Sequence, residues 1–211
     1  MQHNLTENLM FIYLRHPATG DNEKGLVAGQ ASQDRHMSPQ GFHGYQQPLA
    51  HLIEIVRGAS NAQNIYIVNT GMTRSVQGAE LLRHRLSKID VAVRTIEIIN
   101  LQERHYGKWE GQSWDEPAEA SSNLTRRNHI KCGGTPPLGE SETQVDARVQ
   151  PQLESIKSLT GIVIVIGHSS IFKSLCRVFH IDAADLSLKD GRIAVIRDLK
   201  QPNLQWHALS P

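Results

Sequence analysis

Four short runs of apolar residues, rich in β-branched side chains, divide the chain into strand-like segments. The runs lie at residues 9–14, 65–68, 162–166 and 193–196. Unbroken apolar runs of this length are typical of strands that are buried on both faces. Residues 91–99 alternate only in part and are a fifth candidate, and residues 204–209 are expected to form a terminal edge strand.

Helical periodicity fills the intervals between these runs. Ser38 and Pro39 predict an N-cap followed by proline at the first helical position. Pro48 interrupts the pattern that follows, so we expect a kink or an early break there. Ser141 begins a capping box in front of another helical pattern. Two more helices are expected, one from Arg74 onward and one over residues 169–179.

Strands that alternate with helices favour an α/β domain, here a three-layer α/β/α sandwich with a mostly parallel central sheet. The length of 211 residues fits one domain over residues 1–211. Residues 107–139 lack clear periodicity and contain the Gly- and Pro-rich stretch "CGGTPPLG". We therefore expect an inserted loop or small cap in that segment rather than a second domain.

Composition excludes several classes of partner. The net charge is +1 and no polybasic arm is present, so a nucleic-acid partner is not expected. The apolar runs are too short to span a bilayer and the first residues do not resemble a signal peptide, which favours a cytoplasmic location without membrane contact. Neither a zinc-protease motif nor a helical histidine pair is found, so no metal and no cofactor are expected. The sequence does not indicate an oligomeric state.

Charged and polar residues follow the predicted strands directly. Arg15 and His16 follow the first run, and Arg74 lies beyond the turn after the second. Glu103 follows the 91–99 segment, and His168 follows "IVIVIG" at the point where a helix begins. Because ligands bind beyond the carboxyl ends of parallel strands, we expect these five side chains to share one site.

Two arginines beside a helix N-terminus suit a phosphoryl group, since the guanidinium fork and backbone N–H groups both bind its oxygens. A neutral imidazole can attack phosphorus. A protonated carboxyl group can donate to the leaving oxygen, and the arginines with His168 can neutralise the developing charge without a metal. The residue pattern by itself leaves open which histidine attacks. Taken singly, each motif is more often a cap, a helix start or a solvated charge, so the hypothesis depends on their joint placement.

A family resemblance supports this interpretation. The matching stretches, in chain order, are "LRHPATGDN", "MSPQGFHGYQ", "NTGMTRSVQGAELL", "LQERHYGKWEG", "GESETQVDARV" and "IVIVIGHSSI". In their order and spacing they resemble the motifs of the histidine phosphatase superfamily, also called phosphoglycerate mutase-like.

The resemblance implies roles for individual residues. His16 would be the nucleophile that forms a phosphohistidine, and Glu103 would be the general acid and then the base for water. Ser169 stands where the family usually has glycine and would still offer its backbone N–H. The phosphoryl group would be bound by Arg15, Asn22, Arg74 and His168. Pro17 and Ala18 replace the glycine and glutamate of the family's first motif, which concerns substrate identity more than the chemistry.

The resemblance also bears on the type of reaction. Arg104 and Tyr106 in "ERHYG", with the paired Arg126 and Arg127, resemble the mutase branch and would contact substrate. "GKWEG" and the short insert resemble the phosphatase branch, which we favour. Arg126 and Arg127 have an alternative interpretation as a solvated basic loop. If they do contact substrate, it carries a second anionic group.

The expected activity is therefore a metal-independent phosphomonoesterase that acts on a small phosphorylated metabolite through a phosphohistidine. The alternatives are a phosphotransferase of the phosphoglycerate mutase type and a non-catalytic protein that binds phosphorylated ligands. Trp109 and Trp114 are expected to pack within the cap.

Overall fold

The computed structural model describes residues 9–31, 35–59, 64–89, 91–119, 123–181, 192–197 and 202–207. A six-stranded sheet in the order β3-β2-β4-β1-β5-β6 forms its centre. The strands are β1 (Met10–Arg15), β2 (Asn64–Asn69), β3 (Ala92–Glu97), β4 (Ile162–Gly167), β5 (Ile193–Ile196) and β6 (Leu204–His207). The first four strands are parallel, whereas β5 runs antiparallel to β1 and to β6. This confirms the predicted α/β fold with a mostly parallel sheet.

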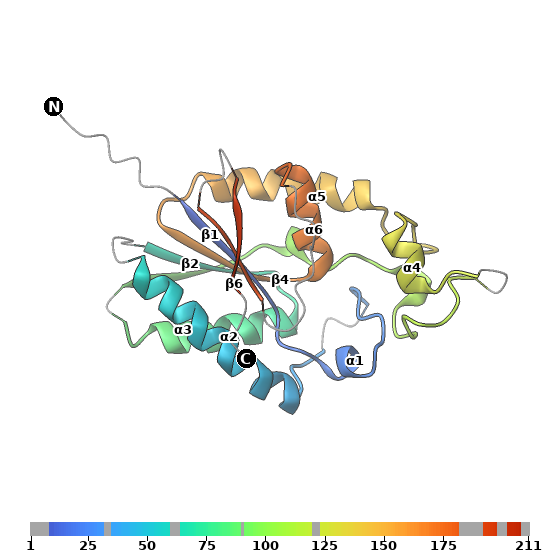
Figure 1. Cartoon of the computed structure of the whole chain (residues 1–211), viewed down its shortest axis with the longest axis horizontal. Helices are drawn as coiled ribbons and strands as arrows, with labels where there is room; N and C mark the ends of the chain where they lie inside the picture. Colours follow the sequence, from blue (N-terminus) through green and yellow to red (C-terminus); the bar gives the residue numbers. More distant parts are fainter. Residues whose placement is uncertain are drawn as a thin grey trace.

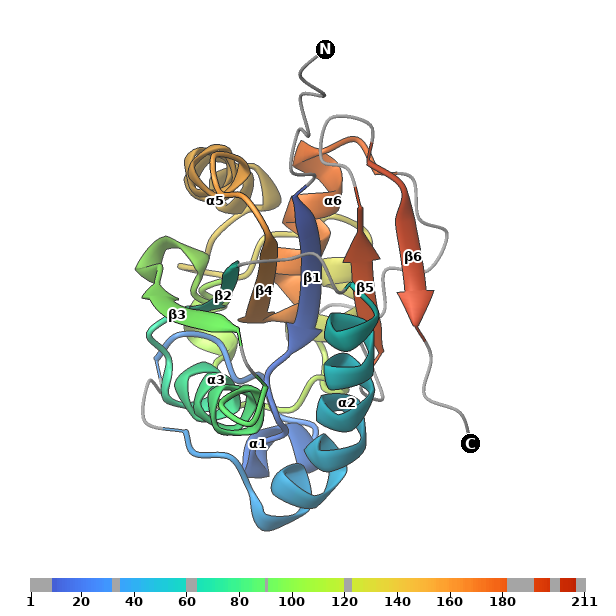
Figure 2. The ribbon, with the colours of Figure 1, turned by 90° about the vertical axis from the view of Figure 1, so that its left-hand side faces the viewer.

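Helices cover both faces of the sheet (Figure 1). The helices are α1 (Gly20–Glu23), α2 (Pro39–Gly58), α3 (Thr73–Leu86), α4 (Arg126–Lys131), α5 (Glu142–Lys157) and α6 (Ser169–Val178), with 3-10 turns η1 (Ile99–Leu101) and η2 (Gly107–Trp109). Figure 2 shows α2 and α3 on one side of the sheet and α5 and α6 on the other. The chain thus forms the expected three layers.

Alternating side chains of the central strands build a separate core on each face. Ile12 and Leu14 of β1 pack in the cluster that includes α2 and α3. Phe11 and Tyr13 pack in the cluster that includes α5 and α6. Each fully buried side chain of this kind contributes about 1.5–3 kcal/mol relative to exposure. Strand β1 is thereby held on both faces, and its carboxyl end is placed by the two cores together.

Of the kink or early break predicted at Pro48, the early break is wrong, because α2 continues through this residue to Gly58. Ser38 caps the helix as expected, since its side chain accepts a hydrogen bond from the N–H of Gly41. Tyr45 before the proline and Leu49 after it are both buried against the sheet. Packing on both sides of Pro48 offsets the one backbone hydrogen bond that proline cannot make.

Residues 107–119 and 123–139, the described parts of the segment expected to be an inserted cap, lie beyond the end of the sheet at which β1 and β4 finish (Figure 1). Trp109 is buried there in a small cluster with Val27, Tyr106 and Ala118, and Trp114 packs against it. Both tryptophans therefore pack the cap, as expected. None of the helices in the described ranges is both long enough and apolar enough to cross a lipid bilayer.

Candidate active site

The carboxyl ends of β1 and β4 bring two histidines together. Arg15 pairs with Gly167 in the parallel register, and the N–H of His16 donates to the carbonyl of Gly167 at 2.9 Å. The rings of His16 and His168 lie with their centroids 5.0 Å apart. The two histidines lie together because parallel strands end at a common edge of the sheet, as the sequence predicted.

The tautomer of His16 follows from its neighbours. Its Nδ1 lies 2.7 Å from the carbonyl oxygen of Pro17. A carbonyl only accepts, so Nδ1 carries the hydrogen and Nε2 keeps its lone pair in the neutral ring. Burial lowers the pKa of His16 well below its usual value, and the charges of Arg74 and Arg15 lower it further. His16 is therefore a neutral imidazole whose Nε2 can act as a nucleophile.

Arg74, at the start of α3, supplies a buried cation beside this nitrogen. Its Nε donates to His16 Nε2 at 3.3 Å and its Nη2 donates to the carbonyl of Gly29 at 3.1 Å. Its Nη1 is buried and has no hydrogen-bond partner among the described residues. Burial lowers the pKa of Arg74 to about 10, which leaves the guanidinium charged at neutral pH. A buried N–H group that makes no hydrogen bond costs free energy, and a bound anion would supply the missing acceptor for Nη1 of Arg74.

His168, the N-cap residue of α6, is held through its backbone. Its N–H donates to the hydroxyl of Tyr13 at 2.8 Å, and that hydroxyl donates to the His168 carbonyl at 2.9 Å. Nε2 of the ring lies 2.9 Å from Thr70 Oγ1, while Nδ1 is buried without a described partner. Burial lowers the pKa of His168 well below its usual value, and Arg74 and His16 add to this effect. The ring thus has one nitrogen left for a ligand.

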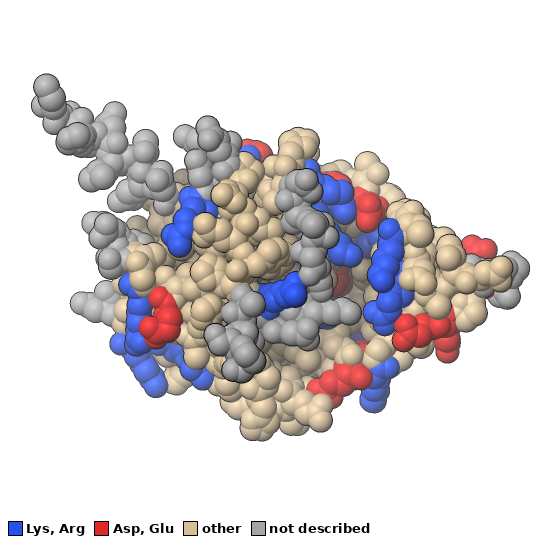
Figure 3. Space-filling view, in the orientation of Figure 1, with Lys and Arg blue, Asp and Glu red and all other residues tan. Residues whose placement is uncertain are grey.

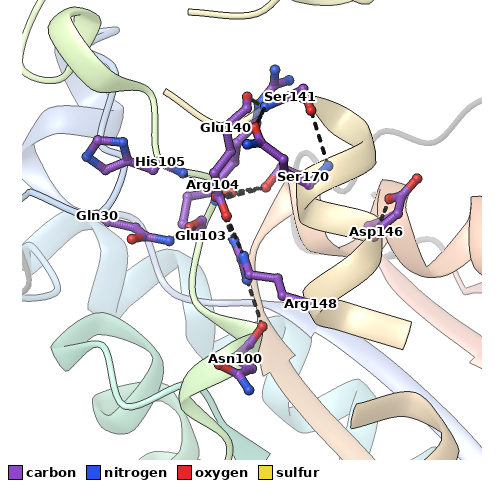
Figure 4. Close-up of polar contacts among 12 residues, drawn as sticks. Gln30, Asn100, Glu103, Arg104, His105, Glu140, Ser141, Asp146, Arg148 and Ser170 are labelled. Atoms are coloured by element: carbon purple, nitrogen blue, oxygen red, sulfur yellow. Dashed lines mark hydrogen bonds and ion pairs between the residues drawn. The ribbon is translucent and has the colours of Figure 1, made fainter. Parts of the chain in front are cut away.

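Glu103 is fixed at both its main chain and its side chain (Figure 4). Its carbonyl accepts hydrogen bonds from Gln30 Nε2 at 2.6 Å and from Arg148 Nη2 at 3.2 Å. Its Oε1 accepts from the N–H of Arg104 at 2.9 Å and from the hydroxyl of Ser170. The negative charge of Glu103 raises the pKa of Arg74, which opposes the lowering by burial. A carboxyl group held in this way is placed to exchange a proton with a ligand at the strand ends.

A second carboxylate, Glu110, organises the loop that contacts Arg74. The side chain of Glu110 is 3% exposed, and its oxygens accept hydrogen bonds from the N–H groups of Gln30 at 3.0 Å, of Tyr106 at 2.7 Å and of Ala31. Gly29 has φ +50°, and a Cβ there would overlap the Glu110 carboxyl group. The loop therefore requires glycine at this position, which presents its carbonyl to Arg74.

Three other predicted phosphate ligands have different placements. Asn22 uses its Oδ1 to accept hydrogen bonds from the N–H and the hydroxyl of Thr19, both at 3.1 Å, and so caps the short α1. Ser169 is the first residue of α6, directly after His168. Arg15 is half-buried at the end of β1, and its charge contributes to the lowered pKa of both histidines.

Four residues were predicted to contact substrate, two just before the cap and two within it. In this structure all four contact protein groups. Arg104 donates to the carbonyls of Glu140 at 2.8 Å and Gly134 at 3.0 Å, and Tyr106 packs edge-on against Trp114. The remaining two, Arg126 and Arg127, form ion pairs with Glu116 at 2.7 Å and Asp115 at 3.1 Å. Figure 3 shows Lys and Arg side chains interspersed with Asp and Glu on the visible face.

Sequence reasoning missed Thr70, Glu110 and Ser170 as parts of the site. Thr70 and Glu110 lie within motifs that matched, but no local pattern shows which side chain each one contacts. Ser170 follows Ser169 at the helix start, and its contact with Glu103 spans 67 positions. Within the described ranges, no group of three or more His, Cys, Asp and Glu side chains is placed to hold a metal ion.

Known proteins share both the sequence pattern and the fold of this chain. The family model of the histidine phosphatase superfamily (branch 1) matches residues 11–196. Solved structures with this fold include a mycobacterial glucosyl-3-phosphoglycerate phosphatase (18% identity, TM-score 0.65, 94% of this chain and 97% of that chain covered). A mutant phosphoserine phosphatase from Entamoeba histolytica, bound to phosphoserine, has 16% identity, a TM-score of 0.65 and coverage of 96% and 98%. Phosphoglycerate mutase from Thermus thermophilus has 20% identity, a TM-score of 0.61 and coverage of 95% and 99%.

No curated protein sequence matches the chain. The likeness to solved structures at these identities establishes the fold, whereas the family model covers most of the chain and establishes the family. The chain belongs to the histidine phosphatase superfamily, branch 1.

Proposed function

We propose that the protein hydrolyses the phosphate monoester of a small metabolite through a phosphohistidine at His16. The observation that supports this most directly is the buried, neutral His16, whose Nε2 faces Arg74 while Nδ1 is held by a carbonyl. Nucleophile and anion-binding donor are thus adjacent, as phosphoryl transfer requires. Two of the solved structures with this fold are phosphatases, which supports hydrolysis.

In the first step, Nε2 of His16 attacks phosphorus and the P–N bond forms while the P–O bond to the leaving group breaks. The protonated Glu103 gives its proton to the departing oxygen, so an alcohol leaves. The imidazole gains positive charge in this step, and the Pro17 carbonyl stabilises it through the Nδ1 hydrogen bond. Nη1 of Arg74 and the open nitrogen of His168 bind the equatorial oxygens as their charge develops.

In the second step, the Glu103 carboxylate removes a proton from water and the water oxygen attacks phosphorus. The P–N bond breaks, inorganic phosphate forms and His16 returns to its neutral state. Glu103 ends the cycle protonated, ready for the next substrate. No step in this sequence requires a metal ion, because Arg15 and Arg74 neutralise the phosphoryl charge and the neutral His168 ring donates a hydrogen bond to it.

The state of the cap arginines favours hydrolysis over the mutase alternative. A mutase has to retain its substrate while the phosphoryl group moves between two positions, which requires cations that are available to a second acidic group. Arg126 and Arg127 are neutralised by Glu116 and Asp115. A substrate without a strongly anionic second group fits this cap.

The test is a His16→Ala variant, with His43→Ala on the exposed side of α2 as the matched control. Each protein is incubated with a panel of phosphorylated metabolites and with p-nitrophenyl phosphate, quenched in alkali, and analysed by intact mass and peptide mapping. We expect a phosphate on His16 in the wild type. Turnover should fall by about 10⁴-fold or more in His16→Ala and stay unchanged in His43→Ala.

Normal turnover by His16→Ala would disprove the mechanism. A stable adduct that passes its phosphate to an acceptor alcohol rather than to water would identify a mutase, and ligand binding without any adduct would identify a phospholigand-binding protein. The cytoplasmic location and the absence of nucleic-acid, membrane and cofactor partners stay predictions.

A further inference from the structure

Glu103 is held differently at its two carboxyl oxygens. Oε1 accepts from the N–H of Arg104 at 2.9 Å and from the Ser170 hydroxyl. No residue in the described ranges donates a hydrogen bond to Oε2. A protonated carboxyl group places its hydrogen on the oxygen that is not already occupied by donors. The proton that Glu103 gives to the leaving oxygen in the proposed first step would therefore be carried on Oε2.

The direction of the Ser170 hydrogen bond follows from its neighbour. The N–H of Arg104 also points at Ser170 Oγ, at 3.2 Å, and a peptide N–H can only donate. The Ser170 lone pair therefore faces Arg104, and the hydroxyl hydrogen is directed to Glu103 Oε1. The Ser170 side chain also shares a hydrogen bond with the side chain of Tyr106, so four groups form a connected set in which Glu103 Oε1 is an acceptor only.

We propose that Ser170 is a positioning residue that keeps the transferable proton of Glu103 on Oε2, so that it faces the departing oxygen. Without this hydroxyl, the carboxyl group can rotate or carry its proton on Oε1, where the hydrogen would face Ser170 and Arg104 rather than substrate. This inference rests on the proposed function, because it concerns the acid of that reaction.

The main chain of Glu103 does not depend on Ser170. Its carbonyl is held by Gln30 and by Arg148, and Arg148 also contacts the Glu140 carboxylate at 2.7 and 3.0 Å (Figure 4). Removal of the Ser170 hydroxyl therefore leaves this carbonyl held and frees the side-chain torsions of Glu103, while the N–H of Arg104 loses one of its two acceptors and still donates to Oε1. The effect should be confined to proton delivery and should leave phosphoryl binding intact.

The experiment compares Ser170→Ala with Ser174→Ala. Ser174 is on the same helix and its hydroxyl also donates to a carboxylate, Asp146 Oδ1 at 2.5 Å, outside the site. The parameters kcat and KM are measured for an alkyl phosphate, which needs protonation of its leaving group, and for p-nitrophenyl phosphate, which does not. Ser170→Thr is included because it restores a hydroxyl.

We expect kcat for the alkyl phosphate to fall about tenfold in Ser170→Ala with KM unchanged, since general acid catalysis supplies about 10²–10⁴-fold and only its alignment is lost. The rate with p-nitrophenyl phosphate should change by less than about twofold, and Ser170→Thr should recover most of the loss. Ser174→Ala should affect both substrates equally, because its hydroxyl contributes to stability and not to proton delivery.

Equal losses on both substrates in Ser170→Ala, or no loss on either, would overturn the positioning role while hydrolysis by the wild type stands. Failure of the wild type to hydrolyse either substrate would instead remove the proposed function. The two failures are therefore distinguished by the wild-type rate alone.

Discussion

Arginines are found both at the strand ends and on the cap, and their charges are compensated in different ways. Arg126 and Arg127 on the cap each face a carboxylate within about 3 Å, as ion-pair partners do. Arg74 at the strand ends contacts a histidine and a carbonyl and keeps one buried nitrogen without a described partner. Among these three arginines, the one without a carboxylate partner is therefore Arg74, which lies on the floor of the site at the strand ends, and this favours binding of an anion there.

The comparison is tested most directly by removing one arginine of each kind. Arg74→Ala should lower kcat/KM by about 10³-fold, because it removes a donor aimed at the phosphoryl oxygens. Arg127→Ala should change kcat/KM by less than about threefold, because Asp115 already neutralises it. Steady-state kinetics and inhibition by inorganic phosphate measure both, and circular dichroism controls for folding. Similar losses of activity in the two variants would break the contrast between floor and cap.

A substitution of Glu103 tests whether the floor of the site supplies a general acid as well as positive charge. Glu103→Gln should slow hydrolysis of alkyl phosphates by about 10²-fold and that of p-nitrophenyl phosphate by only a few-fold, since the better leaving group departs without a proton. The measurement is a series of leaving groups with increasing acidity. Equal losses across the series would remove Glu103 from the acid role.

The contact between Pro17 and Gly78 tests how far the floor of the site depends on tight packing next to His16. A Cβ at Gly78 would lie 2.8 Å from Pro17 Cδ and 2.9 Å from Ile166 Cγ2. Gly78→Ala should destabilise the fold by about 1–3 kcal/mol through overpacking. It should also lower kcat/KM about tenfold, because the Pro17 carbonyl holds His16.

The double variant Pro17→Gly/Gly78→Ala should recover part of this loss, and Gly44→Ala is the control, since a Cβ there meets nothing within 4 Å. Urea unfolding and kinetics on the wild type, the two single variants and the double variant form a double-mutant cycle. A cycle without coupling would show that Pro17 and Gly78 act independently.

The buried histidines at the strand ends should also make stability depend on pH. The pKa values of His16 and His168 are lowered in the folded state by burial, whereas an unfolded histidine titrates near pH 6.5. Below about pH 6.5 the unfolded chain binds more protons than the folded chain, so the free energy of unfolding falls as pH falls. The loss continues down to the lowered pKa values, at up to about 1.4 kcal/mol per pH unit for each histidine.

Urea unfolding between pH 8 and pH 5 measures this slope. His16→Gln should remove about half of the contribution that the two histidines make, because glutamine has no proton to gain. An identical slope in the variant would mean that His16 takes up its proton equally in the folded and unfolded states, which would contradict a lowered pKa for this residue.

Much of the fold could be predicted because it depends on local patterns. All six expected strands form. The four inner strands contain runs of β-branched residues, which fit the buried centre of a sheet, whereas β3 and β6 are partly exposed edge strands. The convergence of His16, Arg74 and His168 followed from the rule that parallel strands end together. The early break expected at Pro48 is absent, because tertiary packing of α2 outweighs one missing hydrogen bond.

The finer features of the site could not be predicted because they depend on contacts between distant segments. Ser170 and Glu103 are 67 positions apart, and Glu110 contacts Gln30, which is 80 positions away. The choice of the attacking histidine depends on the orientation of a carbonyl at Pro17 and of a guanidinium at Arg74. Neither orientation leaves a signal in the spacing of residue types.

The pairing of β1 with β4 has a consequence for biosynthesis. Tyr13 and His168 are 155 positions apart, yet the hydroxyl of one holds the backbone of the other. A ribosome that adds about 5–20 residues per second needs roughly 10 to 30 s to make the intervening chain. During that time the apolar β1 has left the ribosome without its parallel neighbour, and such unpaired strands are prone to aggregate. The edge of the sheet that carries His16 and His168 is therefore among the last parts of the molecule to form, and a nascent chain arrested before β4 exposes β1 to chaperones.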